Sequence, residues 1–252
     1  MKTIGVFDSG VGGLSVLQAL LAEMPSAQFV YAADSGHAPY GERTAEQVSH
    51  RTHRITRHLR ETHALDALVI ACNTATAHAI DSLRLEHPDL PIVGVEPALK
   101  PAATITRSGH IGVLATRGTL SSARVLGLRD RLRASSDRPL QFSFQPCDGL
   151  ANAIERHDTQ AIETLCTRFV NELLTNAKDG PQIDTLVLGC THYPFASELI
   201  RRISGPQVTV VDTGAAVARR TREVLGVPQG TPDSHACEAA LPILLASAQP
   251  HS

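Results

Sequence analysis

The stretch DALVIACNTATAHAI, residues 66–80, shows the unit from which this chain is built. Its apolar run, residues 67–71, is typical of a buried strand, and Asn73-Thr74 directly after it is typical of the start of a helix. A strand followed at once by a helix is the unit of parallel sheets with crossover helices. Cys72 lies at the junction. A thiol there is either a small buried apolar group or a reactive group, and this stretch alone leaves both open.

The same alternation of strand and helix continues along most of the chain. Seven further segments have the composition of strands: Thr3–Phe7, Gln28–Ala32, Pro91–Val95, His110–Ala115, Gln141–Gln145, Thr185–Gly189 and Gln207–Val211. Helical patterns separate them, and the clearest are Gly12–Met24, Thr44–Glu61, Thr119–Arg133 and Gln160–Ala177. Regular alternation of this kind predicts an α/β protein with parallel sheets.

The strand series occurs twice, in the same order and at a nearly constant spacing. IGVFDSG (4–10) is similar to IGVLATRG (111–118), and FVYAADSG (29–36) to FSFQPCDG (142–149). DALVIACNT (66–74) is similar to DTLVLGCTH (184–192), and IVGVEP (92–97) more loosely to VTVVDT (208–213). The repeat predicts two pseudo-symmetric lobes, each a mostly parallel sheet flanked by helices. We expect residues 1–97 plus 209–252 in the first lobe and 98–208 in the second. Because ligands bind at the carboxyl ends of parallel strands, we expect the active-site cleft between the lobes.

Composition excludes several classes of partner. The chain has 252 residues, a net charge of −2, 4% aromatic residues and no Trp, which favours neither nucleic acid nor an anionic membrane surface as a partner. No apolar stretch is long enough to span a membrane, and the N-terminus has no signal-type apolar region, so we expect a cytoplasmic protein. The five cysteines contain no CxxC pair, which predicts free thiols and no metal site.

Two of these thiols occupy equivalent positions of the repeat. Cys72 and Cys190 each follow a strand at an expected helix start, where backbone N–H groups and the helix dipole favour a thiolate. Two thiols on opposite sides of one carbon suit stereoinversion, because one removes a proton and the other returns one. The N–H groups of Asn73, Thr74, Thr191 and His192 are candidates to stabilise the carbanion and its carboxylate. The alternative is a pair of buried structural cysteines, the interpretation that we favour for Cys147, Cys166 and Cys237.

Polar residues at neighbouring strand ends are the other candidates. Asp8-Ser9 follows the first strand, where it either binds an ammonium group and assists Cys72 or caps a helix. His192 is a natural proton partner for Cys190, with a structural turn as its alternative. Thr116 and Thr119 either donate hydrogen bonds to a ligand or cap a helix.

Three other features have simpler interpretations. The glycines of DSGVGGLS (8–15) lack the spacing of a phosphate loop, because Ser15 stands where a third glycine is needed, and they predict close approach of backbone to a ligand. The histidines at 50, 53, 58 and 63 lie among arginines, which favours a solvated helix face over a metal site. APYGER (38–43) is a loop in which Tyr40 and Gly41 are placed to close over a ligand.

Taken together, DSGVGGLSVL, APYGER, ACNTATA, VEPALKPA and GCTHYPF resemble the glutamate racemases of the cofactor-independent aspartate/glutamate racemase superfamily, in order over residues 4–226. The resemblance implies interconversion of L- and D-glutamate for peptidoglycan, with no cofactor, a small-molecule substrate and a homodimer. It implies that Cys72 and Cys190 exchange protons with the substrate, assisted by Asp8 and His192, and that Glu155 is an acid near the substrate ammonium. The substrate-binding positions that it implies are Asp8, Ser9, Tyr40, Gly41, Asn73, Thr74, Thr191 and His192.

Other functions remain open on the sequence alone. One is a superfamily relative that acts on aspartate, hydantoins or a malonate, although decarboxylating members keep a single cysteine. Another is a two-lobed binding protein, which would not need two thiols. A thiol redox pair is the last, but the two cysteines are far apart in sequence and form no CxxC motif.

Overall fold

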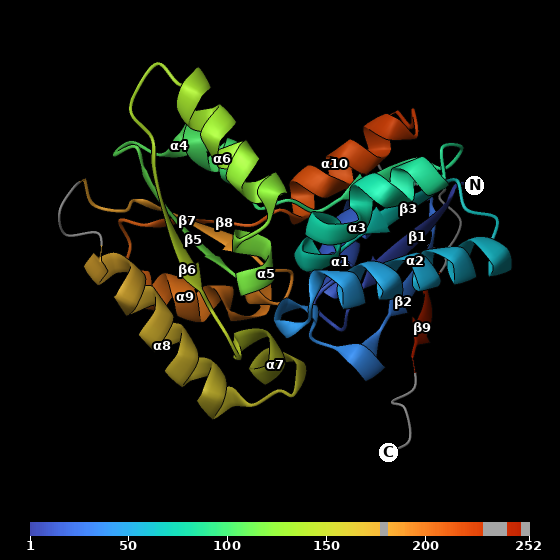
Figure 1. Ribbon diagram of the computed structural model, residues 1–252, viewed down its shortest axis with the longest axis horizontal. Helices are drawn as coiled ribbons and strands as arrows, with labels where there is room; N and C mark the ends of the chain where they lie inside the picture. The colour runs from blue at the N-terminus through green and yellow to red at the C-terminus, as the bar shows by residue number, and fades with distance from the viewer. Residues whose placement is uncertain (177–180, 229–240, 248–252) are drawn as a thin grey trace. The chain divides into compact units, whose positions relative to one another are not determined.

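The structure, a computed structural model, describes residues 1–176, 181–228 and 241–247. The chain forms two compact units: the first comprises residues 1–95 with the chain from 214 onward, and the second residues 96–213. Each unit contains one fully parallel sheet with helices on its faces (Figure 1). The predicted α/β class, with two parallel sheets flanked by helices, is confirmed.

The first unit has five strands in the order β4-β3-β1-β2-β9. Its elements are β1 (Thr3–Asp8), α1 (Leu14–Glu23), β2 (Gln28–Ala33), the 3₁₀ turns η1 (Ser35–His37) and η2 (Tyr40–Glu42), α2 (Ala45–Thr62), β3 (Ala67–Ile70), α3 (Asn73–Glu86), β4 (Ile92–Gly94), α10 (Gly214–Val224) and β9 (Ile243–Ala246).

Successive residues of β1 face opposite sides of this sheet. Ile4 and Val6 pack in one apolar cluster with α1 and α10, whereas Phe7 packs in another with α2 and α3. Both faces of a central parallel strand are therefore buried, which explains its continuous apolar sequence.

The second unit has four strands in the order β6-β5-β7-β8. Its elements are α4 (Leu99–Ile105), β5 (His110–Ala115), α5 (Arg117–Leu120), α6 (Ala123–Ser135), β6 (Gln141–Pro146), α7 (Leu150–Glu155), α8 (Thr159–Asn176), β7 (Thr185–Gly189), the 3₁₀ turn η3 (Tyr193–Ala196), α9 (Ser197–Ser204) and β8 (Thr209–Val211). One apolar cluster joins this sheet to α7, α8 and α9, and another joins it to α4 and α6.

The two sheets share one strand order. In chain order, β5, β6, β7 and β8 correspond to β1, β2, β3 and β4. In both sheets the first of these four strands lies between the second and the third, and the fourth lies next to the third. The internal repeat of the sequence is therefore a repeat of topology. The strand β9, which lies outside the repeat, pairs with β2 at the sheet edge and was not predicted.

The observed boundaries between the units differ from the predicted ones. The strand β8 pairs with β7, so residues 209–211 belong to the second sheet and not, as predicted, to the first lobe. The chain passes between units after Val95 and again after Thr213. The internal repeat, which matches VTVVDT (208–213) to IVGVEP (92–97), is consistent with the observed place of this strand as the fourth of the second sheet.

An equivalent aspartate ties the start of the sheet together in both units. The carboxylate of Asp66 accepts the backbone N–H of Thr3 at 2.8 Å, and that of Asp184 accepts the N–H groups of Arg107 and Ser108 at 2.7 and 2.8 Å. Asp184 also accepts the Thr106 hydroxyl at 2.6 Å. Burial alone would raise the pKa of Asp184, but these hydrogen bonds outweigh it and lower the pKa to about 2.

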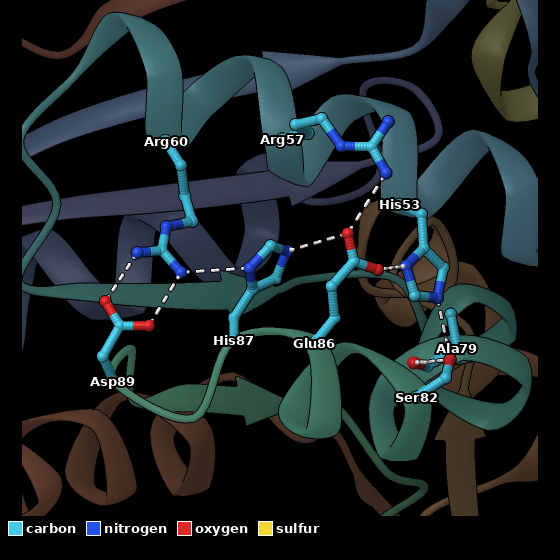
Figure 2. Close-up of polar contacts among 8 residues, drawn as sticks. All are labelled: His53, Arg57, Arg60, Ala79, Ser82, Glu86, His87 and Asp89. Carbon is cyan, nitrogen blue, oxygen red and sulfur yellow. Dashed lines mark hydrogen bonds and ion pairs between the residues drawn. The ribbon is translucent and has the colours of Figure 1, made fainter.

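The basic face of α2 is only partly solvated, which corrects the sequence prediction (Figure 2). His53 and Arg57 contact Glu86 on α3 at 2.6 and 3.1 Å, and Arg60 forms a bidentate pair with Asp89 at 2.6 and 3.0 Å. These contacts join α2 to α3 and the turn after it. In the described ranges, no group of three or more side chains is placed to hold a metal ion, and no helix is long and apolar enough to cross a membrane.

We expect Asp184→Asn to lower the free energy of unfolding by about 2 kcal/mol at pH 7, because a folded pKa of about 2 lies below the ordinary value of 3.8. Urea unfolding measures the loss. The stabilisation is complete above pH 3.8 and is lost as the pH falls towards 2, so the variant and the parent should converge in acid.

The matched control is Asp66→Asn. Its side chain is 31% exposed and its partner Lys2 47% exposed, so the loss should stay below about 1 kcal/mol. Equal losses at both positions would contradict this account of Asp184.

Candidate active site

The pairing of β1 with β3 brings Asp8, Ser9 and Cys72 to one sheet edge. Phe7 lies opposite Ile70, so the residues that follow each strand meet beyond its carboxyl end. The thiol of Cys72 points to the hydroxyl of Ser9 at 3.8 Å, and the carboxylate of Asp8 accepts the N–H of Gly10 at 2.9 Å. All three residues are buried.

The glycine-rich loop lets the chain pack closely against this aspartate. A Cβ atom at Gly13 would lie 2.5 Å from the Cβ of Asp8 and 2.8 Å from the hydroxyl of Tyr31. Glycine is needed at this position so that α1 can start directly over the Asp8 side chain.

Cys72 caps α3, as the strand-to-helix pattern predicts. Its sulfur accepts the N–H of Ala75 at 3.5 Å, and Asn73 and Thr74 are the first two residues of the helix, both buried. The amide nitrogen of Asn73 donates to the carbonyl of Val95 at 3.3 Å. The amide oxygen of Asn73 is buried and has no hydrogen-bond partner in the described part of the chain. A ligand with an N–H group would supply one.

Tyr40 is anchored through its hydroxyl, and this anchor includes two residues that the sequence analysis missed. The hydroxyl donates to Asp34 at 2.6 Å, and Arg51 forms a bidentate pair with the same carboxylate at 2.6 and 2.8 Å. Burial alone would raise the pKa of Asp34, but the bonds from Arg51 and Tyr40 lower it to about 2. Burial and this carboxylate raise the pKa of Tyr40. Gly41 follows Tyr40 in η2 and is partly buried.

Tyr40 also belongs to the apolar cluster that contains Cys72. We call Ser9, Tyr40, Cys72 and Asn73 the Cys72 site. The role of Asp34 had a signal in the sequence, since Asp34-Ser35-Gly36 after the second strand matches Asp8-Ser9-Gly10 after the first. Arg51, interpreted as part of a solvated face, is in fact only 14% exposed.

In the second unit, Cys190 lies in a chain of buried polar groups. Its sulfur is 3.7 Å from Nδ1 of His192, whose Nε2 is 2.6 Å from a carboxylate oxygen of Glu155. The imidazole is 3% exposed and the carboxylate 16%. An imidazole that donates its Nε2–H to Glu155 presents Nδ1 as an acceptor to the thiol. We call Glu155, Cys190 and His192 the Cys190 site.

Glu155 reaches His192 because α7 packs against η3. The helix starts after Gly149, whose φ of +82° is in the left-handed region that favours glycine, and Glu155 is its last residue. The resemblance implied an acid near a substrate ammonium group, and the structure places Glu155 against the imidazole.

The chain after Cys190 differs from the prediction. We expected an α-helix start at Thr191-His192, but these residues form a turn that leads into the 3₁₀ turn η3, and α9 begins only at Ser197. Pro194 has no N–H group and cannot join an α-helical hydrogen-bond ladder, which favours the tighter turn. Thr191 is buried beside Cys190.

The remaining candidates have structural positions. Thr116 caps α5 by accepting the N–H of Thr119 at 3.3 Å, and the two hydroxyls lie 2.9 Å apart. Cys147 and Cys166 are buried, and burial raises the pKa of Cys147 and raises that of Cys166 to about 11. Cys237 lies outside the described residues.

Comparisons with known proteins identify the family. The family model described as Asp/Glu/Hydantoin racemase matches residues 4–221. The chain therefore belongs to the Asp/Glu/hydantoin racemase family and is an isomerase.

Within that family, the chain is similar to several glutamate racemases. A glutamate racemase of Ectopseudomonas mendocina is 51% identical over 88% of this chain and 82% of its own, and one of Pseudomonas aeruginosa is 49% identical over 88% and 81%. Among solved structures, Escherichia coli glutamate racemase in complex with L-glutamate and the activator UDP-MurNAc-Ala has a TM-score of 0.80 and 33% identity, over 99% of this chain and 90% of that one. Glutamate racemase isoform RacE1 of Bacillus anthracis has a TM-score of 0.78 and 30% identity, over 97% and 86%.

We expect Asp34→Asn to lower the free energy of unfolding by about 3 kcal/mol, because Arg51 would keep its charge in a nearly buried position without a carboxylate. Asp89→Asn is a matched control, since Asp89 also binds an arginine in bidentate fashion but is 67% exposed. Its loss should be clearly smaller than that of Asp34→Asn, because solvent screens an exposed ion pair. Urea unfolding of both variants checks the difference, and similar losses would show that burial is not the cause.

Proposed function

We propose that the protein is a glutamate racemase, which interconverts L- and D-glutamate by moving the α-proton between Cys72 and Cys190. The observation that carries the proposal is the matched position of the two thiols at the carboxyl end of the third strand of each sheet, with Cys190 directly after β7 and Cys72 two residues after Ile70 of β3. Names of relatives at about half identity support the substrate. Inversion without a cofactor requires a base on one face of the α-carbon and an acid on the other, and we propose that the two thiols fill these two roles.

In the proposed reaction, one proton leaves the α-carbon and one proton is returned to it. A thiolate on one side takes the α-proton and becomes a thiol, and the thiol on the other side donates a proton to the opposite face and becomes a thiolate. We propose that Cys72 takes the proton from D-glutamate and Cys190 from L-glutamate. Each turnover leaves the two cysteines in exchanged protonation states, which suits them to the reverse reaction.

The two thiols have different proton partners. In the Cys190 site, His192 can accept the thiol proton on Nδ1 while Glu155 holds the opposite edge of the ring. In the Cys72 site, the N–H of Ala75 and the start of α3 favour the thiolate. Asp8 is the proposed carboxylate assistant, by its position one residue from Ser9.

Polar groups of the Cys72 site are the proposed substrate contacts. The amide oxygen of Asn73 has no partner in the described residues, so it is a candidate acceptor for the substrate ammonium group. Ser9, Tyr40, Gly41 and Thr74 complete this set, and Thr191 with His192 contributes from the second unit. Thr116 and Thr119 are also proposed substrate contacts, through hydrogen-bonding atoms other than the Thr116 hydroxyl oxygen and the Thr119 N–H that form the cap of α5.

The wider role follows from the same proposal. We infer a cytoplasmic homodimer that supplies D-glutamate for peptidoglycan and needs no cofactor. Incubation of the purified protein with L-glutamate alone, followed by polarimetry, tests the reaction. A steady optical rotation over hours would reject it.

We expect Cys72→Ala and Cys190→Ala each to reduce racemisation at least about 10³-fold, because each removes a proton donor or acceptor that no neighbour replaces. Cys166→Ala is the control, since Cys166 lies in the α8 core, and it should retain activity. Circular dichroism of glutamate measures the rates. Substantial activity in either of the first two variants would contradict the two-thiol mechanism.

Racemisation in D₂O should place deuterium at the α-carbon of product formed from either enantiomer, because the returned proton comes from a thiol that exchanges with solvent. Mass spectrometry of the product measures it. In Cys190→Ala we expect exchange without inversion for D-glutamate, and in Cys72→Ala for L-glutamate. Full retention of protium in the product of the parent enzyme would indicate return by a single base.

A further inference from the structure

A cavity in the first unit is lined by residues of α2 and of the sheet edge formed by β2 and β9. Figure 1 labels these three elements. Its volume is about 280 Å³, close to the lower end of small-molecule sites. Its lining comes from three elements and the residue after β9: Ala32, Ala33, Arg51, Arg54, Ile55, His58, Leu245, Ala246 and Ser247. None of these residues belongs to the Cys72 site.

The charged part of the lining is basic. Among the described residues, no aspartate or glutamate lines the cavity, and three of the lining side chains are Arg51, Arg54 and His58. Arg51 is neutralised by its bidentate pair with Asp34. In the described ranges, the side chains of Arg54 and His58 have no hydrogen-bond or ion-pair partner, and both residues are exposed. A ligand here therefore meets at least one uncompensated guanidinium.

The remainder of the lining is apolar and held in place. Ala32, Ala33 and Leu245 belong to the paired strands β2 and β9. Ser247 ends this wall, where its hydroxyl oxygen accepts the N–H of Gly36 at 3.0 Å and its side chain also hydrogen-bonds Asp34. Ser247 therefore already has hydrogen-bond partners in Gly36 and Asp34, and the apolar side chains of the lining can pack against a ligand.

We propose that this cavity binds a small anion, a phosphate or carboxylate group, carried on a short apolar body. The head group would contact Arg54 and His58, because guanidinium groups bind phosphate and carboxylate oxygens in bidentate fashion. The body would cover Ala33 and Leu245. A free amino acid fits poorly, because no carboxylate lines the cavity to bind its ammonium group, so this is not a second copy of the proposed substrate site.

Phenyl phosphate is a suitable probe, since it combines both parts. Titration of the full-length protein, followed by the ³¹P line width of the probe, should give saturable binding with a Kd of about 1 mM or tighter. Inorganic phosphate and phenol, which each carry one part, should displace phenyl phosphate with at least about fivefold weaker apparent affinity. Benzoate, added as a competitor to phenyl phosphate, should displace it if the cavity also accepts a carboxylate.

Two variants locate the probe in this cavity. Arg54→Gln should weaken binding about fivefold to tenfold, because it removes the charged hydrogen bonds. Ala246→Phe should abolish binding by filling the space. Arg51 is not substituted, because it holds Asp34 and, through it, Tyr40.

Matched controls are Arg57→Gln and His50→Gln, which remove a charge and an imidazole from α2 outside the cavity. Both should bind the probe within about twofold of the parent. Circular dichroism of all four variants tests whether they are folded. No saturable binding to the parent up to about 10 mM, or binding that Arg54→Gln and Ala246→Phe leave unchanged, would overturn the proposal.

Discussion

In each sheet the first strand pairs in parallel with the third, and the positions of the thiols depend on this pairing. Parallel strands in register end at the same edge, so residues far apart in sequence meet there without any further element to hold them. Ser9 and Cys72 meet in this way beyond β1 and β3. The polar residues at this edge are buried, so backbone N–H groups and neighbouring side chains must satisfy them, as the N–H of Ala75 and the hydroxyl of Ser9 do for Cys72.

The repeat fixes the position of each thiol but not its neighbours. Cys72 caps a regular α-helix, and its hydrogen bonds come from a hydroxyl and a backbone N–H. Cys190 precedes a proline-containing turn and contacts an imidazole that is itself held by a carboxylate. The same strand end therefore carries two different acid–base environments. Such a difference is expected if duplicated units came to handle opposite faces of a chiral centre.

The sequence was most informative where one strand or one short motif decides the structure. All eight expected strands are present, and Cys72 caps α3 as its motif predicts. The errors arise where a partner is distant in sequence. Arg51 looks like one of several arginines on a polar face until Asp34, on another element, is seen to bind it. Likewise the run Ile243–Ala246 has no repeat partner, and only its pairing with β2 makes it a strand.

Glu155 shows the same limit for a candidate site residue. Its motif, at the end of a short helix, indicated an acid close to the proposed site, but periodicity could not show that the carboxylate meets His192. That contact depends on how α7 packs on η3, and hence on the turn that Pro194 favours. A proline that interrupts the expected helix thus has a consequence for chemistry, because the turn carries His192 between the thiol and the carboxylate.

The polar groups of the two units differ in how fully they are hydrogen-bonded. This difference distinguishes groups that stabilise the fold from a group that is a candidate to bind a ligand. Asp34 and Asp184 accept several hydrogen bonds each, and their low pKa values mark them as groups that stabilise the fold. The amide oxygen of Asn73 is buried and accepts none from the described residues. An unsatisfied buried acceptor costs about 1–3 kcal/mol. The described residues leave this oxygen without a donor, which is the arrangement expected of a group that binds a ligand.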